Sequence, residues 1–213
     1  MSTKHSAAWP HIKRGLVAIL RGVKPDEIAA IGDVLLEAGF EAIEIPLNSP
    51  DPFASIETLA KRAPKGVLIG AGTVLTAANV QRLYDAGGRL LVTPNVDPDV
   101  LGKAADLNMI SMPGVFTATE ALLAIKCGAS ALKFFPASAL GPTGVNAIRA
   151  ILPKDTVIGA VGGVADADFD SWMEVGVKTF GLGSSLYKPG AKAADVAIAA
   201  MRAVNAYDVA AAG

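Results

Sequence analysis

One lysine lies in the middle of a short apolar stretch, Ala131-Leu132-Lys133-Phe134-Phe135-Pro136-Ala137. Moving an ammonium group out of water into such surroundings either costs several kcal/mol or lowers its pKa until the proton is lost. A lysine that is partly neutral near pH 7 is the nucleophile that Schiff-base chemistry needs. The other interpretation is a lysine on the exposed face of a strand, and this stretch alone does not decide between the two.

Two more charged side chains lie in apolar runs elsewhere in the chain. Glu44 stands between two isoleucines, and Arg21 ends the run that begins at Leu16. Only 18% of the residues are charged, so three such side chains favour a shared site over coincidence. A carboxylate in apolar surroundings beside a lysine can take and return protons, and the planar guanidinium of Arg21 fits a substrate carboxylate. The alternative role of Glu44 is a structural ion pair with Arg21 or Lys133.

The elements that would position these side chains recur along the chain. An amphipathic helix, a Gly, Asn or Pro stop and a short apolar strand repeat about every 20 to 25 residues, the length of one βα unit with short loops. Most of the strands are continuously apolar, as strands buried on both faces should be. We expect them at residues 16–21, 42–47, 68–73, 90–94, 110–113, 131–136, 157–162 and 179–183.

Eight strands alternating with eight helices predict an α/β fold, a single (β/α)₈ TIM barrel formed by residues 1–213. A doubly wound open sheet is the second choice, although it normally has fewer units. We expect residues 1–15 to form an N-terminal helical extension, with a short helix near 6–14 that plugs the N-terminal end of the barrel. The alanine-rich segment 206–213 is expected to be a frayed tail.

Glycine-rich segments follow the last two predicted strands. Gly162-Gly163 ends one strand, and Gly183-Ser184-Ser185 ends the next. In a (β/α)₈ barrel the site lies at the carboxyl ends of the strands, and these two loops commonly bind phosphate through backbone N–H groups. Glycine allows the backbone to approach the anion closely, so the pattern predicts a phosphorylated ligand. At the end of the third strand, Thr73 could hold a carboxylate through its hydroxyl and N–H.

Composition and charge exclude several classes of function. The formal net charge is −1, which gives no electrostatic reason to expect nucleic acid or an anionic membrane as a partner. No apolar run approaches the length of a membrane span, and the polar segment from Met1 to Pro10 does not resemble a secretory signal. With Cys127 as the only cysteine, no disulfide can form within the chain. We therefore expect a soluble, cytoplasmic protein.

Histidine is nearly absent, which bears on metal chemistry. The only two, His5 and His11, precede the first predicted strand, so the barrel would supply no histidine to a catalytic zinc or iron site. No tight group of Asp and Glu occurs at the predicted strand ends, although a Mg²⁺ site built from carboxylates alone remains open. We expect chemistry without a metal.

Several motifs together resemble those of the KDPG/KHG aldolase family, in order from about Leu16 to Tyr187. They are Glu44-Ile45-Pro46-Leu47-Asn48-Ser49-Pro50, Gly70-Ala71-Gly72-Thr73-Val74, Val92-Thr93-Pro94-Asn95, Leu132-Lys133-Phe134-Phe135-Pro136 and Ala160-Val161-Gly162-Gly163-Val164. The resemblance implies a class I, metal-independent pyruvate aldolase on a (β/α)₈ barrel, usually a homotrimer. Its substrate would be a phosphorylated 2-keto-3-deoxy sugar acid, and no cofactor would be needed beyond the covalent Schiff base.

The resemblance also implies roles for individual residues. By matching motif, Lys133 is the Schiff-base lysine and Glu44 the general acid/base. It further implies that Arg21 and Thr73 contact the substrate and that Pro94 and Phe135 shape the pyruvate pocket. The phosphate would be bound by Gly162, Gly163, Gly183 and Ser184.

Two positions bear on which sugar acid is cleaved. Gluconate-type members of the superfamily usually carry Arg where Asn48 stands and Thr where Val161 stands, so these two residues favour the galactonate-derived epimer. The alternatives are the gluconate-derived epimer or use of both. A metal-dependent phosphosugar epimerase is disfavoured because barrel histidines are missing. A phosphosugar-binding barrel without catalysis would leave Lys133 and Glu44 unexplained.

Overall fold

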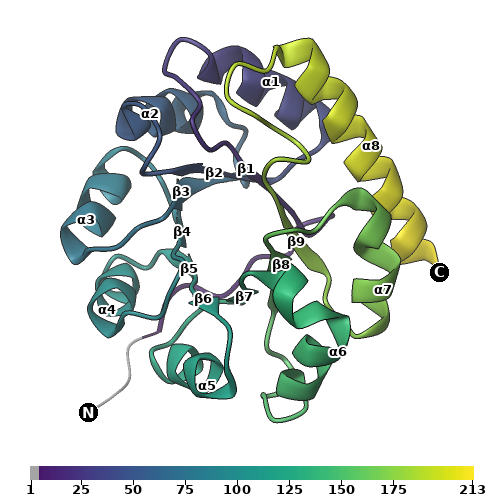
Figure 1. Ribbon diagram of the computed structural model, residues 1–213. Helices are drawn as coiled ribbons and strands as arrows, with labels where there is room; N and C mark the ends of the chain where they lie inside the picture. The colour runs from purple at the N-terminus through teal and green to yellow at the C-terminus, as the bar shows by residue number, and fades with distance from the viewer. Residues whose placement is uncertain (1–4) are drawn as a thin grey trace.

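The computed structural model describes residues 5–213 as a ring of parallel strands surrounded by helices (Figure 1). The strands are β1 (Leu16–Ile19), β2 (Ala42–Pro46), β3 (Leu68–Gly72), β4 (Leu90–Val92), β5 (Ile110–Met112), β6 (Gly114–Val115), β7 (Leu132–Phe134), β8 (Ile158–Val161) and β9 (Thr179–Leu182). The helices are α1 (Ile28–Ala38), α2 (Pro52–Arg62), α3 (Ala77–Asp85), α4 (Pro98–Asp106), α5 (Ala118–Lys126), α6 (Ala137–Arg149), α7 (Phe169–Glu174) and α8 (Ala193–Ala212), with a 3₁₀ turn at Asp166–Asp168.

The nine labelled strands form an eight-stranded barrel. The sheet runs in the order β5-β4-β3-β2-β1-β9-β8-β7-β6, and only Pro113 separates β5 from β6 in the chain. Proline has no N–H to give to a neighbouring strand, but its carbonyl accepts a 2.9 Å hydrogen bond from the Lys133 N–H. One predicted strand therefore serves both neighbours, and the (β/α)₈ prediction is confirmed with a nearly closed barrel. For each of the other predicted strands, both ends lie within two residues of the ends of the observed strand.

Both faces of the strands are buried, which explains their continuous apolar sequence. One set of strand side chains packs outward against the helices, as Leu16 and Ala18 do. The residue between them, Val17, belongs to a second cluster with Leu68 and Leu90. The side chains of this second cluster fill the N-terminal end of the barrel as a packed core. The strands can therefore hold side chains at their carboxyl ends in fixed positions.

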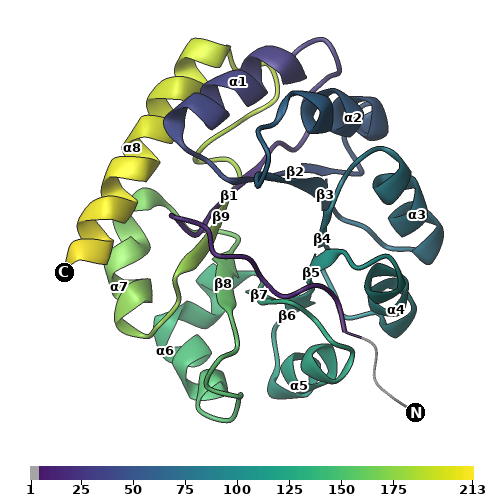
Figure 2. The ribbon, with the colours of Figure 1, turned by 180° about the vertical axis from the view of Figure 1, so that it is seen from behind.

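The predicted N-terminal helix is wrong. Among the described residues, 5–15 form no helix, and residues 1–4 of the predicted extension lie outside the described part. The segment instead crosses the N-terminal opening of the barrel as an extended strap (Figure 2). Its backbone N–H groups bond to the barrel, from Ser6 to the Gly128 carbonyl at 3.0 Å and from Ala7 to the Met109 carbonyl at 2.9 Å. Trp9 packs against the second cluster. The segment therefore does cover the N-terminal end of the barrel, but as an extended chain and not as a helix.

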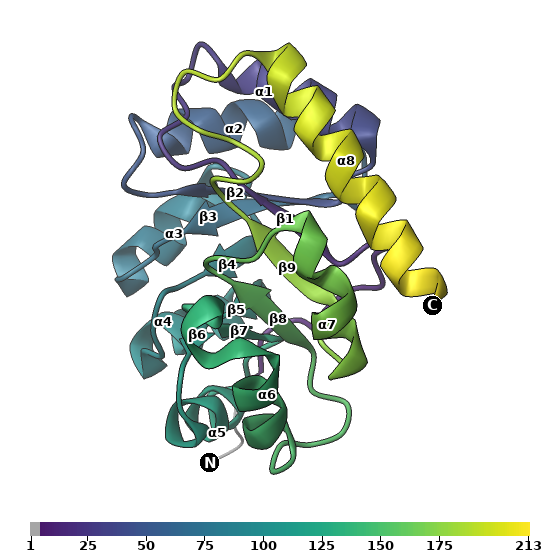
Figure 3. The same cartoon turned by 45° about the vertical axis from the view of Figure 1, so that its right-hand side comes forward.

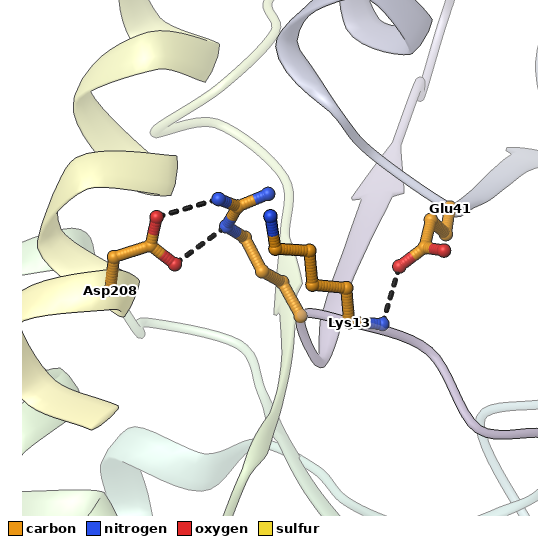
Figure 4. Close-up of polar contacts among 4 residues, drawn as sticks. Lys13, Glu41 and Asp208 are labelled. Carbon is orange, nitrogen blue, oxygen red and sulfur yellow. Dashed lines mark hydrogen bonds and ion pairs between the residues drawn. The ribbon is translucent and has the colours of Figure 1, made fainter. Parts of the chain in front are cut away.

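The predicted frayed tail is also wrong. α8 continues to Ala212 and lies beside α1 and α7 (Figure 3). Tyr207 is buried and its hydroxyl donates to the Lys178 carbonyl at 3.0 Å. Asp208 accepts two hydrogen bonds of 2.6 Å from the Arg14 guanidinium, next to the bond from the Lys13 N–H to Glu41 (Figure 4). Alanine favours helix, and these contacts hold the last turns of α8 against the residues just before β1 and β9.

Within residues 5–213, no helix combines the length and the apolar character that a membrane crossing requires.

Candidate active site

Lys133 and Glu44 are both buried inside the barrel. Lys133 is in the middle of β7 and is 7% exposed, and Glu44 is in the middle of β2 and is 2% exposed. Burial lowers the pKa of Lys133, and the positive charge of Arg21 lowers it further, whereas the charge of Glu44 raises it. The two strands thus bring a lysine with a lowered pKa within electrostatic reach of a buried carboxyl group.

The pKa of the Glu44 carboxyl group is shifted in the opposite direction to that of Lys133. Burial raises its pKa to about 7, against the attraction of Lys133 and Arg21 and a hydrogen bond from the Gly72 N–H. Its Oε2 atom is buried and has no hydrogen-bond partner. A group of this kind is about equally protonated and ionised near neutral pH, the condition under which it can both accept and return a proton. Lys133, Glu44 and Arg21 therefore lie within electrostatic reach of one another, and their shared role in a site stays a prediction.

Two further contacts shape the space around these charges. The Nζ atom of Lys133 lies 4.9 Å from the centre of the Phe135 ring, so this ring borders the amine. The Nη1 atom of Arg21 donates to the Oδ1 atom of Asn48 at 2.5 Å. Arg21 and Asn48 are both exposed at the barrel mouth. The amide of Asn48 therefore holds the guanidinium at the barrel mouth.

The glycine-rich loops after β8 and β9 meet at a cavity of about 170 Å³ beside this group. Gly162 and Gly163 have φ angles of 89° and 76°, values that favour glycine. A Cβ atom on Gly163 would lie 2.6 Å from the side chain of Ser138. The cavity is lined by Ile19, Arg21, Phe135, Val161, Gly162, Gly163, Val164, Gly181, Gly183, Ser184 and Ser185. All four predicted phosphate-binding residues therefore lie at one cavity, together with Arg21, Phe135 and Val161.

The backbone after β9 is arranged as a helical turn. The Gly183 carbonyl accepts hydrogen bonds of 2.9 Å from the N–H groups of Leu186 and Tyr187. In such a turn the first N–H groups, here those of Ser184 and Ser185, have no carbonyl within the turn to bond. They are therefore the natural donors to an oxyanion in the cavity.

Thr73 and Pro94 lie on the same rim of the barrel. Thr73 directly follows β3, and Pro94 follows β4 after one residue. Thr73 has a φ of 55°, a left-handed conformation that is uncommon for a β-branched residue. Strained backbone of this kind often occurs at ligand sites. The position of both residues agrees with the predicted site, and their contact with substrate stays a prediction.

Three residues of the site were not among the predicted ones. Gly72 lies against the Glu44 carboxylate, Ser49 accepts a 2.9 Å hydrogen bond from the Gly22 N–H, and Ser185 has a buried hydroxyl without a partner at the cavity wall. Ser49 is 8% exposed and joins the loops that carry Arg21 and Asn48. The sequence did contain signals that could have identified them: Ser49 and Ser185 each follow a strand, and Gly72 is the second glycine of a Gly-X-Gly segment.

Among residues 5–213, no group of three or more His, Cys, Asp or Glu side chains is arranged to hold a metal ion. Catalysis without a metal stays a prediction.

Comparison with known proteins places this site in a family. Residues 11–201 match the family model described as KDPG and KHG aldolase. The chain is 60% identical over 199 residues to a probable 2-dehydro-3-deoxy-6-phosphogalactonate aldolase of Rhizobium meliloti (strain 1021), covering 93% of this chain and 94% of the relative. It is 44% identical over 195 residues to 2-dehydro-3-deoxy-6-phosphogalactonate aldolase of Escherichia coli (strain K12), covering 92% of this chain and 95% of the relative.

A solved structure described as native KDPGal has the same fold as this chain. It superposes with a TM-score of 0.94 at 43% sequence identity and covers 97% of this chain and 100% of its own. The family match spans all the strands that carry the buried lysine, the buried glutamate and the glycine-rich cavity. The chain therefore belongs to the KDPG and KHG aldolase family of carbon–carbon lyases.

Proposed function

We propose that this protein cleaves 2-dehydro-3-deoxy-6-phospho-D-galactonate to pyruvate and D-glyceraldehyde 3-phosphate, in the breakdown of galactonate. The observation that carries the proposal is the buried pair of Lys133 and Glu44 beside a glycine-rich cavity. The substrate follows from the two galactonate-type relatives, which match more than nine tenths of the chain.

The reaction begins at Lys133. Its lowered pKa increases the neutral fraction of the amine, which attacks the C2 ketone to give a carbinolamine. Loss of water then gives an iminium ion that can accept an electron pair. The ring of Phe135 and the surrounding strands restrict the space at the amine. No metal is needed to polarise the ketone, because the iminium carries the positive charge.

Glu44 then moves the protons. Its carboxylate accepts the proton of the C4 hydroxyl as the C3–C4 bond breaks and the aldehyde forms. The electron pair of that bond passes to the iminium and leaves an enamine on Lys133. Protonation of the enamine at C3 and addition of water at C2 release pyruvate and the free amine. A carboxyl pKa of about 7 suits a group that must act in both directions.

The other polar groups hold the substrate. The N–H groups after β8 and β9 would bind the phosphate, with Gly162 and Gly163 on one side and Gly183 and Ser184 on the other. Arg21 would bind the substrate carboxylate and is held by Asn48. Both ends of the substrate are then fixed, so that C2 lies at Lys133.

Preference for the galactonate epimer rests on Val161. This side chain is 6% exposed at the end of β8 and lines the cavity. It has no hydrogen-bonding group for a C4 hydroxyl that points towards it, so the epimer with that orientation lacks support. A side-by-side cleavage assay of the two epimers tests the proposal. Higher kcat/KM for the galactonate-derived epimer supports it, and higher kcat/KM for the gluconate-derived epimer contradicts it.

We also propose that the enzyme is a cytoplasmic homotrimer. Support for self-association comes from apolar side chains on and just before α5, where Phe116, Leu122 and Leu123 are 39%, 45% and 37% exposed. Such groups gain free energy when a second copy covers them. Light scattering after size-exclusion chromatography should give three times the 21.7 kDa chain mass, and a monomer would contradict the proposal.

A further inference from the structure

The carboxylate of Glu44 occupies space that a side chain at position 72 would need. A Cβ atom built on Gly72 would lie 2.5 Å from Glu44 Cδ and nearer still to both carboxylate oxygens. These three atoms are the nearest ones to that Cβ position. Ordinary contacts between such atoms are about 3.5 Å. The glutamate can therefore take its observed position only because residue 72 has no side chain.

The pairing of two strands creates this contact. In the parallel register of β2 with β3, Glu44 lies opposite Gly70 and Pro46 lies opposite Gly72. The glutamate side chain thus reaches about two residues along the strands, towards the mouth of the barrel. There its carboxylate lies against the backbone of Gly72. Gly72 leaves the space open for it.

Backbone conformation does not explain the glycine. Gly72 is not among the residues with positive φ, whereas the next residue, Thr73, has a φ of 55°. Alanine can adopt the backbone of position 72 without strain of this kind. The requirement for glycine therefore comes from the carboxylate.

We propose that Gly72 is a positioning residue, which fixes the carboxylate of Glu44 at the barrel mouth by leaving out a Cβ atom. The inference rests on the proposed role of Glu44 as the general acid/base. In Gly72→Ala the carboxylate must move by about 1 Å to restore an ordinary contact distance. Misplacement of a catalytic group by about 1 Å can cost about 100-fold in rate.

The test is a double-mutant cycle between Gly72→Ala and Glu44→Ala, with Gly102→Ala as the matched control. Gly102 lies in α4, and a Cβ atom there would meet nothing within 4 Å. For each variant, kcat/KM for cleavage and Tm are measured. We expect Gly72→Ala to lose about 100-fold in kcat/KM and to have a lower Tm, and Gly102→Ala to match the wild type in kcat/KM.

The decisive comparison is made without the glutamate. In the Glu44→Ala background the space is empty, so adding Gly72→Ala should change neither kcat/KM nor Tm. A further fall in both quantities in that background, or normal cleavage by Gly72→Ala alone, would overturn the proposal. Where residual cleavage by Glu44→Ala is too slow to measure, the Tm cycle decides. A wild type and a Gly102→Ala variant that both fail to cleave would instead refute the proposed function.

Discussion

The raised pKa of Glu44 predicts that this residue destabilises the folded protein at neutral and alkaline pH. The folded protein holds the proton up to about pH 7, whereas a glutamate in water has a pKa of 4.5. Between these two values the folded state binds the extra proton, so stability falls as the pH rises through this window. Below it both states are protonated and Glu44 costs nothing. Above it the full cost is present.

The size of this cost follows from the same two values. Each pKa unit corresponds to about 1.4 kcal/mol, so ionised Glu44 costs the folded state about 3 kcal/mol above pH 7. This cost remains although the charge of Lys133 lowers the pKa of Glu44, because burial has the larger effect. Glu44→Gln keeps the shape and cannot ionise. It should therefore be more stable than the wild type at alkaline pH and should lose this advantage in acid.

Thermal unfolding of both proteins at about pH 4 and about pH 8.5 measures the effect. For a chain of this size, about 3 kcal/mol corresponds to a change in Tm of roughly 6–12 °C. The Tm of Glu44→Gln relative to the wild type should rise by this amount from the lower to the higher pH. The new amide of glutamine adds a penalty that does not depend on pH, so the change with pH is the quantity to compare. Protein concentration is held fixed because association also shifts Tm.

Glu57→Gln is the matched control, since Glu57 is 54% exposed in its ion pair with Lys61. An exposed pair contributes about 0–1 kcal/mol, so its effect on Tm should hardly change between the two pH values. An equal difference between Glu44→Gln and wild type at both pH values would refute the reasoning about burial.

Three further predictions concern activity. EDTA should leave cleavage unchanged, and loss of activity that Zn²⁺ or Mg²⁺ restores would contradict a mechanism without metal. Gly163→Val should raise KM for the phosphorylated substrate about 10- to 100-fold, the effect of losing one hydrogen bond to a charged group, with little change in proton exchange of pyruvate. Equal effects on both reactions would mean that the loop is only structural. Val161→Thr should shift the kcat/KM ratio of the two epimers by up to about tenfold towards the gluconate-derived one, and an unchanged ratio would refute the argument about this position.

The barrel could be predicted because its strands are buried on both faces. Continuous apolar runs separated by helix stops mark such strands, and all eight runs became barrel strands. The same logic identified Glu44 and Lys133, since a charge inside such a run stands out. The apolar run alone did not show whether Glu44 and Lys133 point into the barrel or outward from it. The resemblance of the motifs to a known family supplied that choice.

The two termini could not be predicted, because tertiary contacts determine their conformation. The segment before β1 bonds to Met109 and Gly128, which are far away in the sequence. The end of α8 is held by Arg14 through Asp208. Neither contact leaves a periodic pattern in its own segment. Local composition therefore favoured a helix at one end and fraying at the other.

The packing of Gly72 against Glu44 was equally hidden. A Gly-X-Gly segment at a strand end indicates close approach of something to the backbone, but not what approaches. The register of β2 against β3 decides that, and it places the glutamate carboxylate over the second glycine. Relationships between neighbouring strands of this kind appear only in the folded chain.

Trapping with borohydride tests the central claim that Lys133 forms a Schiff base with pyruvate. Reduction in the presence of pyruvate should add one stable adduct per chain, and peptide mapping by mass spectrometry should locate it at Lys133, which is buried next to Glu44. Lys133→Arg should gain no adduct, because arginine stays protonated and cannot form the imine. An adduct on another lysine, or no adduct on the wild type while borohydride and pyruvate label a known class I aldolase, would contradict the account.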